Sequence, residues 1–209
     1  MVKIKEMPPN EKYAMVVDYM KFDESFILPF VQKNLGDQAV TELKNAWGEG
    51  AKPIPENASF EGKYETAYSN WIWLAKSTYS FIRNRMGEDG IRRFERDEVE
   101  ALKRKNTSPA LHLLNFIRLF SPGTAFAMTA KQMSYQLQWL TPYTVPELNK
   151  TKAVLDIPRC KILDFPGTED ICLIGCQSTY PMWVADQFKV DMKFKRQGNS
   201  CIGTLIPLS

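Results

Sequence analysis

The sequence lacks a long apolar run and a strong charge of either sign. No run approaches the roughly 18–20 apolar residues that a membrane span requires, and the N-terminus lacks the charged-then-apolar layout of a signal peptide. The 27 basic and 24 acidic residues give a net charge of +3, which is too small to indicate nucleic-acid binding. We therefore expect a cytoplasmic protein with reduced thiols that binds neither membranes nor nucleic acid.

Histidine is almost absent, because His112 is the only one in 209 residues. This excludes the common zinc hydrolase sites built from three histidines, or from two histidines and a carboxylate. His112 lies in an apolar segment, where a histidine is more often a packed core residue than the general base of a cysteine nucleophile. P-loop and dinucleotide-binding glycine motifs are also absent.

Cysteine is missing from the first 159 residues and then occurs four times, at Cys160, Cys172, Cys176 and Cys201. Cys172 and Cys176 are four residues apart, so a helix directs both sulfurs to one face. The cysteines can be ordinary buried thiols, since free cysteine packs as a small hydrophobe. Alternatively, all four hold zinc or an iron–sulfur cluster, one of them is a nucleophile, or two of them form a regulatory disulfide. For a nucleophile the sequence favours Cys172, near a helix start, or Cys176 one turn later.

The hydrophobic period changes from about 3.6 to 2 near residue 130. This predicts one α+β domain over 1–209, with a helical portion (1–130) packed on one face of a small antiparallel sheet (131–209). The second portion has the order β-β-α-β-β, and its outer face carries Gln and Lys and can face water. We expect strands near 133–139, 152–157, 190–195 and 201–208, a loop over 141–149, and a helix over 168–187.

Several helices are also predicted. Pro29 and Pro181 are expected to break or kink their helices, and Gly87 to end the helix that begins near Tyr64. The densely charged segment 91–105 predicts a helix on the surface. Ser108-Pro109 begins a helix that is apolar nearly all round to Phe120, which predicts a buried helix.

The C-terminal pattern resembles a known group of domains. A strand ending in Arg159-Cys160, a helix carrying Cys172 and Cys176, and a hairpin at Gly198-Asn199-Ser200-Cys201 are similar to the 4-vinyl-reductase-type ligand-binding domains. They are also similar to the related L-2-amino-thiazoline-4-carboxylate hydrolase-like proteins. The resemblance covers about residues 130–209, and the helical half in layout only.

This resemblance implies a small-molecule pocket between the sheet and the helices, and a homodimer. It further implies a hydrolase that acts on a C–N bond of a small cyclic or carboxylate-bearing substrate, with Cys176 or Cys172 catalytic. Among nearby residues, Arg159 is a candidate to hold a substrate carboxylate, and Tyr180 and Trp183 are candidates to line the pocket. The alternative is a non-catalytic sensor or accessory protein that binds a ligand, or a metal through the four cysteines.

Overall fold

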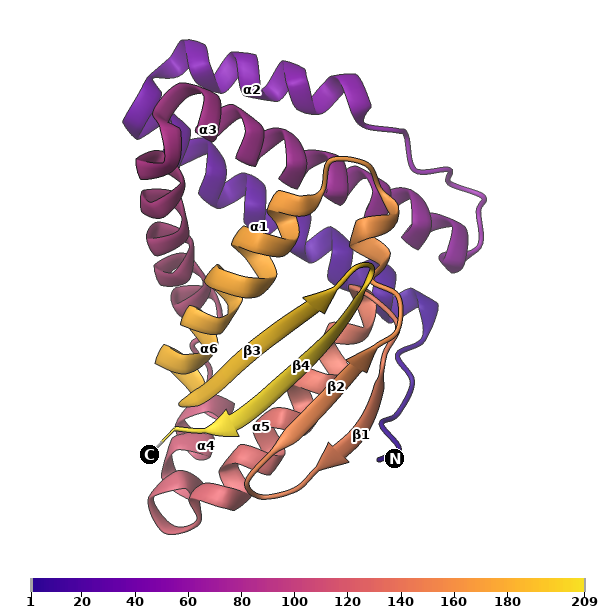
Figure 1. Ribbon diagram of the computed structural model, residues 1–209. Coiled ribbons are helices and arrows are strands. Elements are labelled where there is room, and N and C mark those ends of the chain that lie inside the picture. The colour runs from indigo at the N-terminus through magenta and orange to yellow at the C-terminus, as the bar shows by residue number, and fades with distance from the viewer. Residues whose placement is uncertain (1, 209) are drawn as a thin grey trace.

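A computed structural model describes residues 2–208 and shows an α+β fold (Figure 1). This confirms the predicted class, with helices packed against a small antiparallel sheet. The helices are α1 (Pro9–Leu35), α2 (Asp37–Gly50), α3 (Phe60–Lys105), α4 (Pro109–Phe120), α5 (Pro122–Gln136) and α6 (Tyr180–Phe188). Shorter helical segments are η1 (Leu137–Trp139), η2 (Lys161–Asp164) and η3 (Ile171–Thr179). The strands are β1 (Thr144–Leu148), β2 (Ala153–Ile157), β3 (Val190–Gln197) and β4 (Ser200–Pro207).

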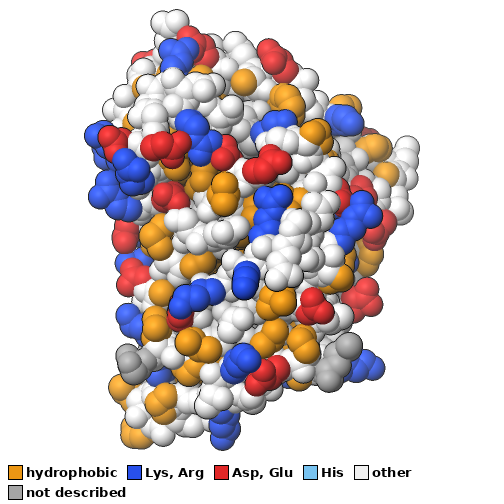
Figure 2. Space-filling view, viewed as in Figure 1, with side chains coloured by type: hydrophobic (Ala, Val, Ile, Leu, Met, Phe, Trp, Pro, Cys, Tyr) orange, Lys and Arg blue, Asp and Glu red, His pale blue; other side chains and the backbone are white. Residues whose placement is uncertain are grey.

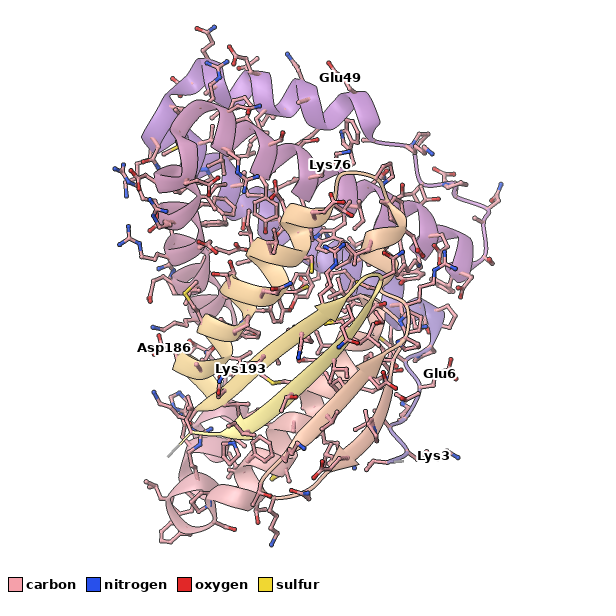
Figure 3. All side chains as sticks on the ribbon, viewed as in Figure 1. Lys3, Glu6, Glu49, Lys76, Asp186 and Lys193 are labelled. Atoms are coloured by element: carbon pink, nitrogen blue, oxygen red, sulfur yellow. The ribbon has the colours of Figure 1, made fainter. Side chains whose placement is uncertain are left out.

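The four strands form one antiparallel sheet in the order β1-β2-β4-β3. In Figure 1, α5 passes behind the sheet and α6 lies beside β3, while the other face is open towards the viewer. Alternate residues such as Met192, Leu205 and Leu155 are buried, whereas Lys193 and Lys195 are exposed. Figure 3 labels Lys193 on β3 and Asp186 on the neighbouring α6. The prediction of a water-facing outer surface is therefore confirmed.

The first strand lies elsewhere than predicted. Residues 133–139 are helical, as the end of α5 and the turn η1, and β1 occupies the segment predicted to be a loop. Residues four apart within this alternation also share a helix face, as Met133 does with Leu137 and Tyr135 with Trp139, and here the preceding helix simply continues. Pro146 lies in β1, which is an edge strand, where its missing N–H removes no bond between strands.

The prolines interrupt the helices less than predicted. Pro29 lies inside a continuous α1, and Pro181 lies in the first turn of α6, which continues directly from η3. Pro181 is accommodated because the π-helix η3 before it is wider than an α-helix, which makes room for the proline ring.

Gly87 ends the first straight part of α3, as predicted, because its φ of 66° and ψ of −165° are not helical, and a second helical part follows directly at a bend. The segment beyond the bend was predicted to be a surface helix, yet Phe94 and Leu102 are each 2% exposed. The bend turns this charged segment so that one side packs against the core.

Helix α4 contradicts the sequence prediction most clearly. Ser108 caps it as expected, since its Oγ accepts a hydrogen bond from the Leu111 N–H at 3.3 Å. None of the described residues of α4 is buried, however, and His112 is exposed rather than packed in the core. Figure 2 shows hydrophobic side chains at the lower left of the surface, where Figure 1 places α4 and its junction with α5. An apolar sequence predicts burial only if another layer covers it, and here only α5 packs closely on α4.

Candidate functional site

An interior cavity of about 70 Å³ lies between α1, α3 and the η3–α6 helix. Its walls are mostly apolar, but two carboxylates face it, and we call it the acidic cavity. That volume holds several water molecules or a small ligand group, and is well below the roughly 300–1,000 Å³ of drug-sized pockets. The polar groups that line it are Tyr19, Asp23, Trp71, Thr78, Tyr79, Glu98, Cys176, Thr179 and Tyr180.

Helical spacing brings the two carboxylates to the cavity. Asp23 lies four residues after Tyr19 and four before Ile27, so it shares the inward face of α1 with them. Its Oδ2 accepts a hydrogen bond from the Trp71 indole N–H at 3.0 Å. Glu98 lies on the second half of α3, between the buried residues Phe94 and Leu102. The bend at Gly87 therefore lets a second acid from the same helix line the cavity.

Burial raises the pKa of both acids. Desolvation raises the pKa of Asp23 to about 7, against the hydrogen bond from Trp71 and the charge of Lys105, which lower it. Desolvation also raises the pKa of Glu98 well above its usual value, and the charge of Asp23 adds to this effect. Within residues 2–208 neither Glu98 Oε2 nor the Thr179 hydroxyl has a hydrogen-bond partner. Near neutral pH, one carboxyl group of such a pair can be protonated and donate its proton, while the other is ionised and accepts one.

Tyrosine hydroxyls supply the remaining polar atoms of the wall. Tyr19 on α1 and Tyr180 on α6 are hydrogen-bonded to each other across the cavity. Burial raises the pKa of Tyr19 to about 12 and raises those of Tyr79 and Tyr180 well above the usual value. These phenols remain neutral at physiological pH, so Tyr79 and the acceptor of the Tyr19–Tyr180 bond can each donate a hydrogen bond to a ligand.

The segment η3 that carries Cys176 and Thr179 into the cavity is a π-helix, wider than an α-helix. Pro181 follows it, and a proline ring clashes with the carbonyl group four residues earlier unless the helix widens or bends there. Long π segments are rare and occur mostly at functional sites. The wider turn determines how far Cys176 and Thr179 project towards α1 and α3.

All four cysteines line a second, apolar cavity of about 40 Å³, which we call the thiol cavity. Cys176 lines both cavities and so lies in the wall between them. All four thiols are free. Desolvation raises the pKa of Cys160, raises that of Cys176 well above its usual value, and raises that of Cys201 to about 11. These three groups are therefore thiols rather than thiolates at neutral pH.

The structure brings some of the predicted site residues together and separates others. Cys176 and Tyr180 line the acidic cavity, and Cys172 lines the thiol cavity, where its sulfur accepts a hydrogen bond from Gln177 at 3.3 Å. Trp183 faces the other side of α6 and bonds to Gln187. Arg159 lines neither cavity, because its side chain is 75% exposed and pairs with Asp164 at 2.9 Å.

The four cysteines converge, as a metal site would require, but no metal-ligating geometry results. In the chain from residue 2 to 208, no group of three or more His, Cys, Asp or Glu side chains is placed to hold a metal ion. The geometry of these residues therefore gives no support to a four-cysteine metal centre.

Four residues that line the acidic cavity are not among the site residues predicted from the sequence, and all come from the helical half: Tyr19, Asp23, Tyr79 and Glu98. A signal for the acids was present, since each lies on an apolar stripe with large apolar or aromatic residues four positions before and after it. An acid in that position has to be buried if the stripe is buried.

No family model, curated protein or solved structure matches this chain. The resemblance in the C-terminal half thus remains a prediction. Over the described range of the chain, none of the helices is both long and apolar enough to cross a membrane.

Proposed function

We propose that the protein is a small-molecule enzyme that hydrolyses a C–N bond, with Asp23 and Glu98 as its acid–base pair. The observation that carries the proposal is two half-buried carboxylates facing one small, mostly apolar cavity, one of them with an oxygen that lacks a hydrogen-bond partner among residues 2–208. Pairs of acids with raised pKa values are typical of active sites that need a proton donor and a proton acceptor at neutral pH.

The environments of the two acids suggest their roles. Asp23 is hydrogen-bonded by Trp71 and lies near the charge of Lys105, both of which lower its pKa and favour the ionised form. For Glu98, Thr179 alone opposes the effect of burial on the pKa, whereas Trp71 and Lys105 both oppose it for Asp23, so Glu98 is the better candidate for the neutral acid. The ionised Asp23 takes a proton from water as the water oxygen attacks the carbon. The C–N bond then breaks, and its electron pair and the proton of Glu98 go to the leaving nitrogen.

The walls favour a cationic or hydrogen-bond-donating substrate, such as a cyclic amidine. Among the described residues, no Lys, Arg or His lines the acidic cavity, so a substrate carboxylate would lack a partner there. Together with the exposure of Arg159, this disfavours the carboxylate-bearing alternative. Cys176 is better suited to shaping the wall than to attacking, because a protonated thiol is a poor nucleophile.

The test is turnover of a panel of cyclic amidines, including 2-aminothiazoline and 2-aminoimidazoline, followed by mass spectrometry at pH 7. We expect Glu98→Gln to lower kcat at least about 100-fold, the usual loss when an acid–base group is removed, and Cys176→Ala to lower it less than about tenfold. Near-normal rates in Glu98→Gln with loss in Cys176→Ala would instead support a thiol nucleophile. Binding by the wild type without any turnover would support the non-catalytic ligand-binding alternative.

We also propose that the protein forms a homodimer through α4. Leu113, Phe116, Leu119 and Phe120 are 59%, 59%, 78% and 76% exposed. These side chains leave on the order of 500 Å² of apolar surface in water, near the upper end for monomers and most of the roughly 800 Å² per partner of a standard interface. A groove of about 540 Å³ between α4 and α5 lies beside this ridge. A ridge next to a groove on one surface suits a two-fold interface, in which each copy inserts its ridge into the other's groove.

A further inference from the structure

A cleft of about 840 Å³ lies on the surface between α1 and the second half of α3, and we call it the α1–α3 cleft. Its volume is within the usual range of ligand pockets, unlike that of the small acidic cavity. Three phenylalanines spaced four residues apart on α1, Phe22, Phe26 and Phe30, line it. Neighbouring rings of this row are 6.4 and 6.1 Å apart. The cleft therefore offers a continuous aromatic wall.

The α1–α3 cleft and the acidic cavity meet at Phe22. Phe22 lines both of them, whereas Phe26 lines only the cleft and Asp23 only the cavity. A displacement of the Phe22 side chain would therefore join the cleft to the space in front of Asp23. The half-buried Phe22 can change rotamer more readily than a fully packed core residue.

A cation already lies at this junction. The Lys105 ammonium is 4.8 Å from the centre of the Phe22 ring and 5.0 Å from that of the Tyr19 ring. It also pairs with Asp18 Oδ2 at 2.6 Å, and its charge acts on Asp23. Two aromatic rings with carboxylates beside them form the kind of site that binds ammonium and amidinium groups. The junction therefore has the chemistry of a cation site, and a side chain of the protein fills it.

We propose that the α1–α3 cleft is the mouth of the acidic cavity, and that it binds the flat apolar part of a ligand whose cationic group replaces the Lys105 ammonium. The ligand class is an aromatic or apolar amine or amidine. The inference rests on the proposed function, since a cation at the Lys105 position acts on Asp23, one of the two proposed catalytic acids. The cleft accounts for the size of such a ligand, because the cavity alone accommodates only its head.

The test uses benzamidine, a flat aromatic amidinium, and measures its binding to the full chain by isothermal titration calorimetry. In Lys105→Met the competing ammonium is gone while the aliphatic stem stays similar, so benzamidine should bind about three- to tenfold more tightly. Lys21→Met is the matched control, because Lys21 lines the same cleft but none of the described aromatic rings holds its ammonium. We expect its affinity to stay within about twofold of that of the wild type.

A second pair of variants tests the aromatic wall. Phe26→Ala should weaken benzamidine binding about three- to tenfold, because an aromatic contact is lost. Phe60→Ala removes an exposed phenylalanine far from the cleft and should change nothing. Asp23→Asn should weaken binding at least about tenfold, since the cation loses its counter-charge.

The outcomes separate this inference from the proposed function. If Asp23→Asn weakens binding but Lys105→Met and Phe26→Ala both leave it unchanged, the cleft is not the mouth, although the acidic cavity still binds the cation. If Phe26→Ala acts but Asp23→Asn does not, the cleft binds the probe without reaching the cavity, which also overturns the inference. Absence of benzamidine binding to the wild type overturns it as well. Turnover of small cyclic amidines is measured independently of all three results.

Discussion

Asp23 and Glu98 occupy positions on helix faces that otherwise serve packing. Removing a carboxylate from water is costly, and a buried acid commonly avoids the cost by keeping its proton. Asp23 retains a hydrogen bond from Trp71, but one oxygen of Glu98 lacks a partner within residues 2–208. An apolar side chain at either position would pack without this cost, so retention of both acids favours a chemical role over a structural one.

The raised pKa of Asp23 predicts that acid pH stabilises the protein relative to alkaline pH. An unfolded chain releases the aspartate proton near pH 3.9, whereas the folded protein holds it to about pH 7. Stability therefore falls as pH rises through this window and levels off above it. Asp23→Asn should remove this dependence. The change that it causes in the free energy of unfolding should therefore be more stabilising at pH 8 than at pH 5, by about 2–4 kcal/mol. Urea denaturation at both pH values measures the difference, and equal effects at the two would show that Asp23 does not titrate this way.

At the residue scale, part of the candidate site was predictable from residue types that commonly take part in catalysis or ligand binding. Cysteines and aromatics led to Cys176 and Tyr180, which do line the acidic cavity. Arg159 adjoins Cys160 in the sequence, but neighbours in a loop point in directions that only the folded backbone determines. Asp23 and Glu98 are not predictable from the sequence in the same way, because acids on a helix are usually solvated. Their burial depends on α1, α3 and α6 meeting around them, and residues so far apart in sequence do not reveal that meeting.

At the scale of elements, the bend of α3 links the fold to the site. Gly87 adopts a backbone conformation with positive φ and extended ψ that is essentially restricted to glycine. The bend sends the second half of α3 along α1, which places Glu98, Leu102 and Lys105 beside the acidic cavity and its junction with the cleft. A straight α3 would carry these residues away from Asp23.

Gly87→Ala should lower the free energy of unfolding by about 1–3 kcal/mol and weaken benzamidine binding. The cost is backbone strain rather than a clash, because among residues 2–208 no atom lies within 4 Å of an added Cβ. Gly48→Ala is the matched control, since its added Cβ also meets open space but its backbone is helical, so it should stabilise by about 0.5–1 kcal/mol. Thermal and urea denaturation provide the comparison. Similar effects of the two substitutions would mean that the bend tolerates an L-residue and does not depend on glycine.

The elements themselves were predictable where long periodic patterns define them. The β-β-α-β-β order, the strands β2, β3 and β4, and the cap of α4 were predicted and confirmed. The first strand was predicted in the wrong place because the alternation over 133–139 is short. The edge strand β1 was not predicted because it contains Pro146, and a proline usually argues against a strand. Local patterns determine the type of an element, whereas tertiary contacts determine whether a helix continues through a proline or a glycine.

At the scale of the whole molecule, the layers account for the exposure of α4. Helices α1 and α3 pack together, α5 covers one face of the sheet, and α6 joins β3 to α3. Helix α4 contacts mainly α5 and lies outside these layers. Its apolar sequence predicted burial, and burial within one chain does not occur. A second copy of the chain, packed against α4, would bury the apolar side chains that the first copy leaves exposed.

This argument predicts that a charge on the α4 ridge will abolish the dimer. Leu119→Asp places a carboxylate at the most exposed leucine of the ridge, so pairing would bury an unpartnered charge, and the protein should sediment as a monomer of 24.0 kDa. Asn115→Asp is the control, because it adds the same charge to an exposed polar position of the same helix, next to Arg118, and should leave the dimer intact. The fold should survive both changes, since neither position is buried. A wild-type protein that sediments as a monomer at tens of micromolar would contradict the proposed interface. If both variants dissociate the dimer, the interface lies on the polar side of α4. That result would contradict an interface in which the apolar ridges of two copies pack together.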